Sequence, residues 1–85
     1  MPAKIKVRVL FFALVKELLG KAATTMELDE GTDTARLLQL LTTKFPALKS
    51  ISGSVMIAVN REYVYSPVRI NNGDEIAFFP PISGG

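Results

Sequence analysis

Residues 4–20, KIKVRVLFFALVKELLG, change hydrophobic period partway along and thereby decide the fold. Over the first eight of these residues the side chains alternate between two faces, which predicts a half-buried β-strand. The apolar face consists of Ile5, Val7, Val9 and Phe11. Residues 12–19 follow the helical period instead, and Gly20 suits the left-handed residue that follows a helix. We therefore expect a strand followed at once by a short helix.

The rest of the sequence predicts one long helix and four more strands. The helix is expected to begin after Thr32 or Asp33, either of which can cap it, and to end before Pro46. Its apolar stripe consists of Leu37, Leu38, Leu41 and Phe45. The strands are expected at residues 22–28, 55–59, 63–65 and 75–79, and residues 47–53 are expected to form a loop.

This order of elements predicts an α+β fold. The first two strands can pair antiparallel, and the long helix can then cross over and cover one face of the sheet. A right-handed crossover returns a strand parallel to the first. The expected architecture is a β-grasp, a mixed sheet with one main helix on one face. Residues 1–79 form this domain, and residues 80–85 form an extended C-terminal tail.

The composition describes one small globular domain and excludes several classes of chemistry. Of 85 residues 48% are hydrophobic, and the formal net charge is +2. Because no run of Lys and Arg stands out, we expect no nucleic-acid partner. No apolar stretch approaches the ~20 residues of a membrane span, so we expect no membrane association and a cytoplasmic location. The sequence has no Cys and no His, which excludes disulfides, thiolate or imidazole metal sites and His-activated nucleophiles.

Charged side chains offer few candidate sites. The acidic pairs at residues 29–30 and 74–75 flank turns, where solvated carboxylates are the expected outcome rather than an acid–base pair. Lys4, Lys6 and Arg8 form a basic row on one face of the first strand. We expect a solvated sheet surface there, and a docking patch for an acidic partner is the alternative.

The end of the chain combines stiffness with small size. Pro80 and Pro81 directly follow the last expected strand, and Gly84 and Gly85 close the sequence. Proline fixes φ and stiffens the base of the tail, whereas residues without a Cβ let a carboxylate enter a narrow channel. The α-carboxylate can be activated by ATP as an acyl-adenylate, which sulfur or nitrogen nucleophiles attack. A frayed end is the alternative.

Exposed aromatic side chains are expected beside this tail. Because Ile76 and Phe78 share one face of the last strand, Phe79 lies on the other. Phe12 has the parity of the outward-facing residues of the first strand. A sheet covered on one side leaves its other face for a partner, so Phe12 and Phe79 are predicted to anchor a hydrophobic patch. The alternative is that Phe12 turns inward with the short helix; Tyr63 is a further candidate, although strand parity is lost across the turn before it.

Three segments of the chain resemble one family. They are residues 5–20, the strand around residues 58–60 (AVN) and residues 72–85 (NGDEIAFFPPISGG). Together they are similar to the MoaD family, the small subunits of molybdopterin synthase, and FFPPISGG is the most specific part. Residues 22–53 match only in pattern, and Asn71-Asn72 stands where relatives often have a more acidic turn.

The resemblance implies a ubiquitin-like fold and a sulfur-carrier role in molybdenum cofactor synthesis. In that family an ATP-dependent E1-like enzyme adenylates the terminal glycine, here Gly85, which sulfur from a persulfide donor converts to a thiocarboxylate. The sulfur then passes to cyclic pyranopterin monophosphate in a MoaE-like large subunit. The catalytic side chains are therefore expected on the large subunit. No cofactor is expected on this chain, since ATP is used by the activating enzyme.

The resemblance also implies roles for individual residues. The tail segment that enters the large subunit consists of Pro80, Pro81, Ile82, Ser83 and Gly84. The side chains similar to family positions at the large-subunit interface are Phe12, Tyr63 and Phe79. The family assembles as a heterotetramer of two small and two large subunits.

Three other functions stay open on the sequence. They are a sulfur carrier for thiazole or thiouridine formation, a ubiquitin-like modifier joined to lysines, and an interaction domain with an inert tail. A chain without Cys cannot hold a persulfide on a side chain, so the terminal acyl carbon is the remaining place for sulfur.

Overall fold

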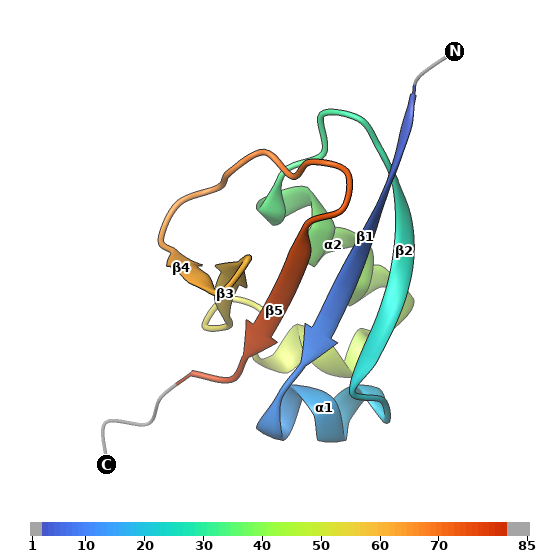
Figure 1. Cartoon of the computed structure of the whole chain (residues 1–85). Helices are drawn as coiled ribbons and strands as arrows, with labels where there is room; N and C mark the ends of the chain where they lie inside the picture. The colour runs from blue at the N-terminus through green and yellow to red at the C-terminus, as the bar shows by residue number, and fades with distance from the viewer. Residues whose placement is uncertain (1–2, 82–85) are drawn as a thin grey trace.

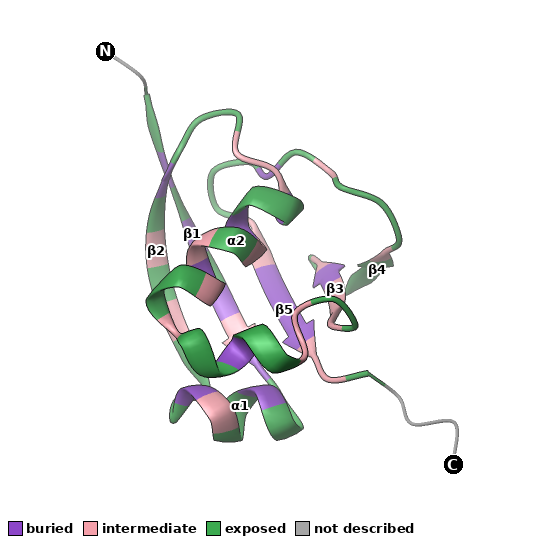
Figure 2. Cartoon of the chain, turned by 180° about the vertical axis from the view of Figure 1, so that it is seen from behind, coloured by how far each residue is buried: buried purple, intermediate pink, exposed green. Residues whose placement is uncertain are grey.

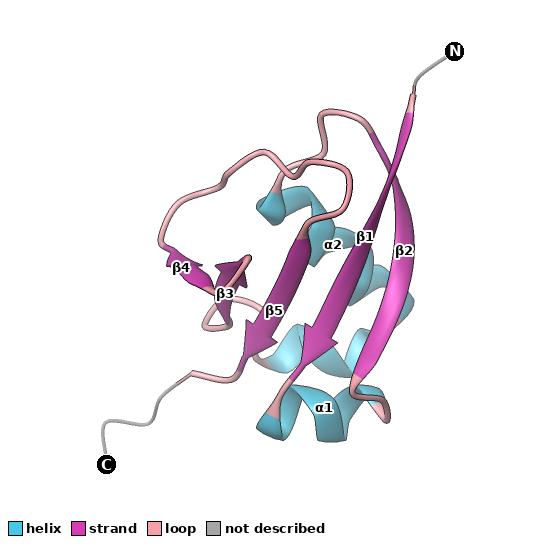
Figure 3. Cartoon of the chain, viewed as in Figure 1, coloured by secondary structure: helices cyan, strands magenta, loops and turns pink. Residues whose placement is uncertain are grey.

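Within residues 3–81, which the computed structural model describes, five strands form one mixed sheet. The elements are β1 (Lys4–Phe11), α1 (Ala13–Leu19), β2 (Ala23–Asp29), α2 (Thr34–Lys44), the 3-10 helix η1 (Pro46–Ser50), β3 (Met56–Val59), β4 (Glu62–Val64) and β5 (Glu75–Phe79). The strand order is β2-β1-β5-β3-β4 (Figure 3). Figure 1 views the uncovered face of the sheet, with the helices behind it. The expected β-grasp architecture is confirmed.

The first and last strands of the sequence are parallel neighbours in the middle of the sheet. Arg8 of β1 lies beside Glu75 of β5, and Phe11 lies beside Phe78. The other pairings, β1 with β2, β3 with β5 and β3 with β4, are antiparallel. Parallel neighbours need a long crossover connection, and α2 is part of it. As a result β1 and β5 end at the same edge of the sheet (Figure 1).

The core lies between the sheet and the helices, as Figure 2 shows from the helix side. Alternation along β1 buries Ile5, Val7, Val9 and Phe11. On α2, Leu37 and Leu41 are fully buried, while Leu38 and Phe45 pack at the margin of the core. The apolar stripe predicted for α2 is therefore the face that covers the sheet.

The predicted helix ends match the structure. Gly20 follows α1 with φ 72°, and its N–H donates to the carbonyl of Lys16. Asp33 is the N-cap of α2, and its Oδ1 accepts a hydrogen bond from the backbone N–H of Arg36 at 2.8 Å. The other candidate, Thr32, donates its hydroxyl to the carbonyl of Asp29 instead.

The predicted loop at residues 47–53 is wrong over its first half. Pro46 opens η1, and Leu48 inside it is fully buried. Proline suits the first position of a helix because its φ is already fixed, and the buried leucine holds the segment against the core. One apolar residue in so short a segment has no period, so the sequence pattern could not reveal it.

Leu41→Ala tests the packing of α2 on the sheet. Because the Leu41 side chain is fully buried, we expect its truncation to lower the free energy of unfolding by about 2–5 kcal/mol. Urea unfolding followed by circular dichroism measures this loss. Gln39→Ala, on the exposed side of α2, should change stability by less than about 0.5 kcal/mol. Similar losses in the two variants would contradict the burial of this helix face.

Candidate functional site

Two phenylalanine rings stack on the uncovered face of the sheet, where β1 and β5 end. The rings of Phe12 and Phe79 have centroids 4.7 Å apart and planes 5° from parallel. The Phe12 side chain is 41% exposed, so it does not turn inward with α1. The outward position predicted by strand parity is therefore correct, whereas a role against a partner stays a prediction.

The backbone at the end of β1 fixes the position of Phe12. Its N–H donates to the carbonyl of Phe78 at 3.1 Å, and its own carbonyl accepts the N–H of Val15 at 3.0 Å. Ala13 has φ 50°, which is uncommon for a residue with a Cβ, and this conformation turns the chain directly into α1. The ring of Phe12 is thus held over Phe79 by its own strand end.

Tyr63 completes the group. Its ring centroid lies 5.6 Å from that of Phe79, with the planes 55° apart, and the side chain is 48% exposed. Tyr63 pairs with Ala58 across β3 and β4, so both side chains are on the uncovered face. The structure therefore brings together all three predicted side chains, Phe12, Tyr63 and Phe79, which we call the aromatic patch.

A hollow of about 520 Å³ adjoins the aromatic patch. Ala58 of β3 and Ala77 of β5 are direct cross-strand partners and form its floor. Larger side chains surround the floor: Leu10 and the aromatic patch at one end, and Arg8, Arg61 and Glu75 at the other. We call this feature the open-face hollow. Sequence reasoning missed it, because the two alanines meet only through pairing of strands that are distant in the chain.

The carboxylate of Asp74 and the backbone of Glu75 have a structural role next to the hollow. Asp74 accepts hydrogen bonds from Nδ2 of Asn60 at 2.9 Å and from the N–H of Asn71 at 2.8 Å. The amide oxygen of Asn60 accepts the N–H of Glu75 at 3.0 Å. These bonds tie the β3–β4 turn to the start of β5, and they hold Tyr63 at a fixed place beside the last strand.

The basic row on β1 is balanced by acidic neighbours. Lys4 forms an ion pair with Asp29, and the hydrogen bond and charge of Asp29 raise the pKa of Lys4 above its ordinary value. Lys6 and Arg8 each have a glutamate as cross-strand neighbour. A solvated surface of mixed charge, as expected, describes this row better than a patch for an acidic partner.

The chain leaves the sheet next to the aromatic patch. Pro80 and Pro81 follow Phe79 directly; Pro80 is partly buried and Pro81 is exposed. Figure 1 shows this exit at the edge where β1 also ends. The remaining predicted tail residues, Ile82, Ser83, Gly84 and Gly85, lie outside the described residues, so the division into domain and tail stays a prediction.

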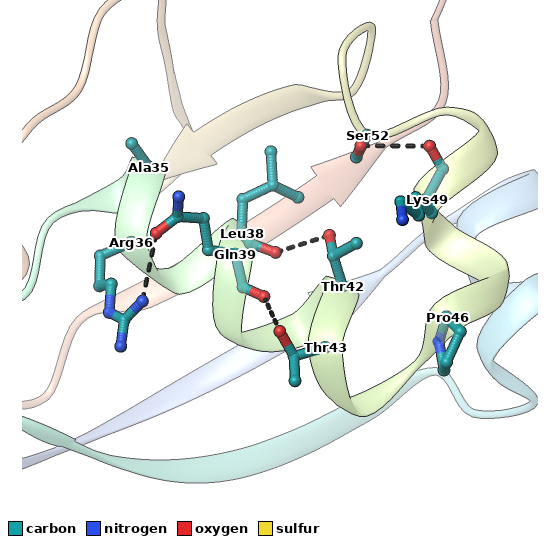
Figure 4. Close-up of a pocket in the computed structure, with 9 residues that line it drawn as sticks. All are labelled: Ala35, Arg36, Leu38, Gln39, Thr42, Thr43, Pro46, Lys49 and Ser52. Carbon is teal, nitrogen blue, oxygen red and sulfur yellow. Dashed lines mark hydrogen bonds between the residues drawn. The ribbon is translucent and has the colours of Figure 1, made fainter.

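A larger groove of about 760 Å³ lies along α2 and η1 and reaches Ser52 (Figure 4). Several of its polar side chains bond within the groove wall. The hydroxyls of Thr42 and Thr43 donate to backbone carbonyls of the preceding turn at 2.8 and 3.0 Å, and Arg36 donates to Gln39 at 3.2 Å. The groove is formed by the elements on the helix side of the sheet, and its described lining residues include none of the predicted site residues.

Residues 3–81 contain no group of three or more His, Cys, Asp or Glu placed to hold a metal ion. No helix among them combines the length and hydropathy that crossing a membrane requires. The open face, with its aromatic patch and hollow, is therefore the candidate site that the described residues support.

Comparison with known proteins identifies the family. The ThiS family model matches residues 9–85. The molybdopterin synthase sulfur carrier subunit of Escherichia coli is 41% identical over 81 residues, covering 93% of this chain and 99% of that protein. The protein of the same name from Arabidopsis thaliana is 36% identical over 83 residues, covering 98% and 86%.

The fold is also found in solved structures. The solution structure of small archaeal modifier protein 1 from Methanosarcina acetivorans is similar with a TM-score of 0.79 and 28% identity, covering 98% of this chain and 99% of that one. The family model and the relatives agree on the family. The model spans β5 and most of the rest of the sheet, and the relatives are more than one-third identical over nearly the whole chain. This protein belongs to the ThiS family, among the molybdopterin synthase sulfur carrier subunits.

Proposed function

We propose that this chain carries sulfur, as the thiocarboxylate of Gly85, to the large subunit of a molybdopterin synthase. The observation that carries the proposal is the position of the aromatic patch, whose stacked rings, 4.7 Å apart, stand where β5 passes into Pro80. A docking surface and a reactive chain end are thereby joined through one strand. The shared name of the two curated relatives supports the choice of reaction.

Activation takes place on an E1-like enzyme. The carboxylate of Gly85 attacks the α-phosphorus of ATP, and pyrophosphate leaves as the acyl-adenylate forms. A persulfide sulfur then attacks the acyl carbon and displaces AMP. Cleavage of the resulting acyl disulfide by a thiol leaves the thiocarboxylate. ATP and reducing thiols are both available in the cytoplasm, which is the location we propose.

The residues of this chain bind and position the carrier end. The aromatic patch provides apolar contact area at the partner surface, and the core beneath it keeps the three rings in place before docking. Pro80 and Pro81 limit the directions in which the tail leaves the sheet. Holding a reactive group near its target in this way converts a bimolecular step into an effectively unimolecular one.

The partner supplies the catalytic side chains. The sequence has no His and no Cys, and the carboxylate of Asp74 beside the hollow is engaged in hydrogen bonds. We therefore assign proton transfer and substrate binding to the large subunit, in which residues 80–85 present sulfur to cyclic pyranopterin monophosphate. Two small and two large subunits form the proposed assembly.

A second candidate function is attachment to other proteins. The likeness to small archaeal modifier protein 1 at 28% identity favours it. The same acyl-adenylate serves both functions, since a lysine amine attacks the acyl carbon in one case and sulfur in the other. The two functions differ in the product that an activated chain forms.

Reconstitution separates these functions. The chain is expressed with its E1-like enzyme and a sulfur donor, and intact-mass spectrometry reads the chain end. We expect one oxygen to be replaced by sulfur, and we expect the thiocarboxylate form with the large subunit to convert the pterin precursor. Lysine conjugates without precursor conversion would support the modifier instead, and an unchanged terminus would contradict both.

Deleting Gly85 should abolish sulfur transfer and leave the fold intact. Among residues 3–81 the core cluster extends from Ile5 to Phe78, and the shortened arm ends roughly 3.3–3.6 Å early. We expect product formation to fall by about 100-fold or more, with an unchanged thermal unfolding curve. Single-turnover assays and calorimetry measure the two effects. A collapse of the melting temperature would show that the terminus stabilises the domain.

Phe79→Ala should weaken large-subunit binding more than it weakens the fold. The ring contacts both other members of the aromatic patch and is only partly buried. We expect a loss of about 2 kcal/mol in binding, or about 30-fold in Kd. Isothermal titration measures it. Tyr65→Ala is the matched control, because Tyr65 is an aromatic side chain 88% exposed and outside the patch; an equal loss there would remove the patch from the interface.

A further inference from the structure

We infer that Arg61 binds a carboxylate on the protein that docks over the open-face hollow. This inference rests on the proposed function, because it assumes that the uncovered face meets the large subunit. It adds a polar specificity contact to an otherwise apolar docking surface. Three features of the β3–β4 turn carry it: the backbone conformation of Arg61, the position of its side chain and its lack of an ion pair within residues 3–81.

The backbone of Arg61 has a conformation that arginine rarely adopts. Asn60 and Arg61 form the two-residue connection between β3 and β4, in which Val59 pairs with Glu62, and their φ angles are 50° and 73°. Hairpin turns with two positive φ angles favour Asn followed by Gly. Asn60 meets that preference, whereas a residue with a Cβ is strained at the second position. Strained backbone conformations of this kind are found most often at functional sites.

The Arg61 side chain lines the open-face hollow at the end away from Phe12. Arg8, at the same end, has Glu75 as its cross-strand neighbour. The carboxylate of Asp74 is engaged by Asn60 and by a backbone N–H. The ion pairs among residues 3–81 are Lys4–Asp29 and Arg69–Glu30, so within that part of the chain neither Arg8 nor Arg61 forms an ion pair. Arg8 differs from Arg61 in having a glutamate as its direct cross-strand neighbour.

These features indicate which side chains of a partner the open-face hollow can bind. The floor of Ala58 and Ala77 admits an apolar side chain between Leu10 and the aromatic patch, and the guanidinium of Arg61 accommodates an aspartate or glutamate next to it. Arginine suits this role because its planar fork can donate two parallel hydrogen bonds to one carboxylate. Glu75 repels a carboxylate placed deeper in the hollow, so the favourable position is the rim at Arg61.

A charge at the rim of an interface acts mainly on association. It steers the encounter between partners, and its effect weakens as salt screens it. The apolar contacts of the aromatic patch instead govern dissociation. Arg61 and Phe79 therefore contribute to different rate constants of the same complex, which lets experiment separate them.

Arg61→Gly is the decisive variant. It creates the preferred Asn-Gly turn, so we expect a melting temperature at or above that of the wild type, while the association rate constant with the purified large subunit falls about tenfold. The remaining association should depend less on salt. Surface plasmon resonance at low and high ionic strength measures both. Lys49→Gln, which removes a cation from η1 on the helix side, is the matched control and should leave association unchanged.

Two further variants make the result unambiguous. Arg61→Lys keeps the charge and the turn strain, so it should restore most of the association rate and its dependence on salt. Acid-to-amide substitutions on the docking surface of the large subunit identify the carboxylate, because the matching one should have no further effect when combined with Arg61→Gly.

The outcomes distinguish this inference from the proposed function. A wild-type chain that binds the large subunit and delivers sulfur, together with an Arg61→Gly chain of equal association rate and salt dependence, overturns the role of Arg61 alone. Loss of binding in Arg61→Gly that Arg61→Lys does not restore also overturns it, since the charge is then irrelevant. A wild-type chain that does not bind the large subunit overturns both.

Discussion

The parallel pairing of β1 with β5 is the constraint on which the rest of this structure depends. It places the last strand of the sequence beside the first, so that both end at one edge of the sheet. The hydrogen bond from Phe12 to the carbonyl of Phe78 continues this pairing beyond β1, and it brings the Phe12 ring over Phe79. Because the crossover that parallel strands require includes α2, one face is covered and the other stays available.

Local patterns predicted most of the elements, and pairing between distant strands determined the rest. The alternation along β1, the apolar stripe of α2 and the turn residues Gly20 and Asp33 are all set within one element, so the sequence displays them directly. The floor of the hollow depends on Ala58 meeting Ala77, nineteen positions later, and no local period encodes that meeting. The face on which Tyr63 lies could not be predicted for a different reason. It depends on the length of the turn between β3 and β4, which sets the register of the returning strand.

Several polar side chains of this domain hold turns against strands and do not form a reactive group. Asn60 and Asp74 use their side chains to attach the β3–β4 turn to β5, and Asn72 accepts the N–H of Lys6 at 2.8 Å. The Asn71-Asn72 turn thus anchors β1 to the segment before β5. A domain built in this way is suited to presenting a chain end, which agrees with the proposal that the partner supplies proton transfer and substrate recognition.

Backbone strain is concentrated around the uncovered face. Within residues 3–81 the non-glycine residues with positive φ are Ala13, Asn60 and Arg61. Ala13 directly follows Phe12, and the other two form the turn that positions Tyr63, so all three adjoin the aromatic patch or the hollow. A core does not need such conformations, and its close packing on the other side of the sheet can support them. A rigid surface loses little conformational entropy on docking, so strained residues next to the aromatic patch are consistent with the proposed docking of this face.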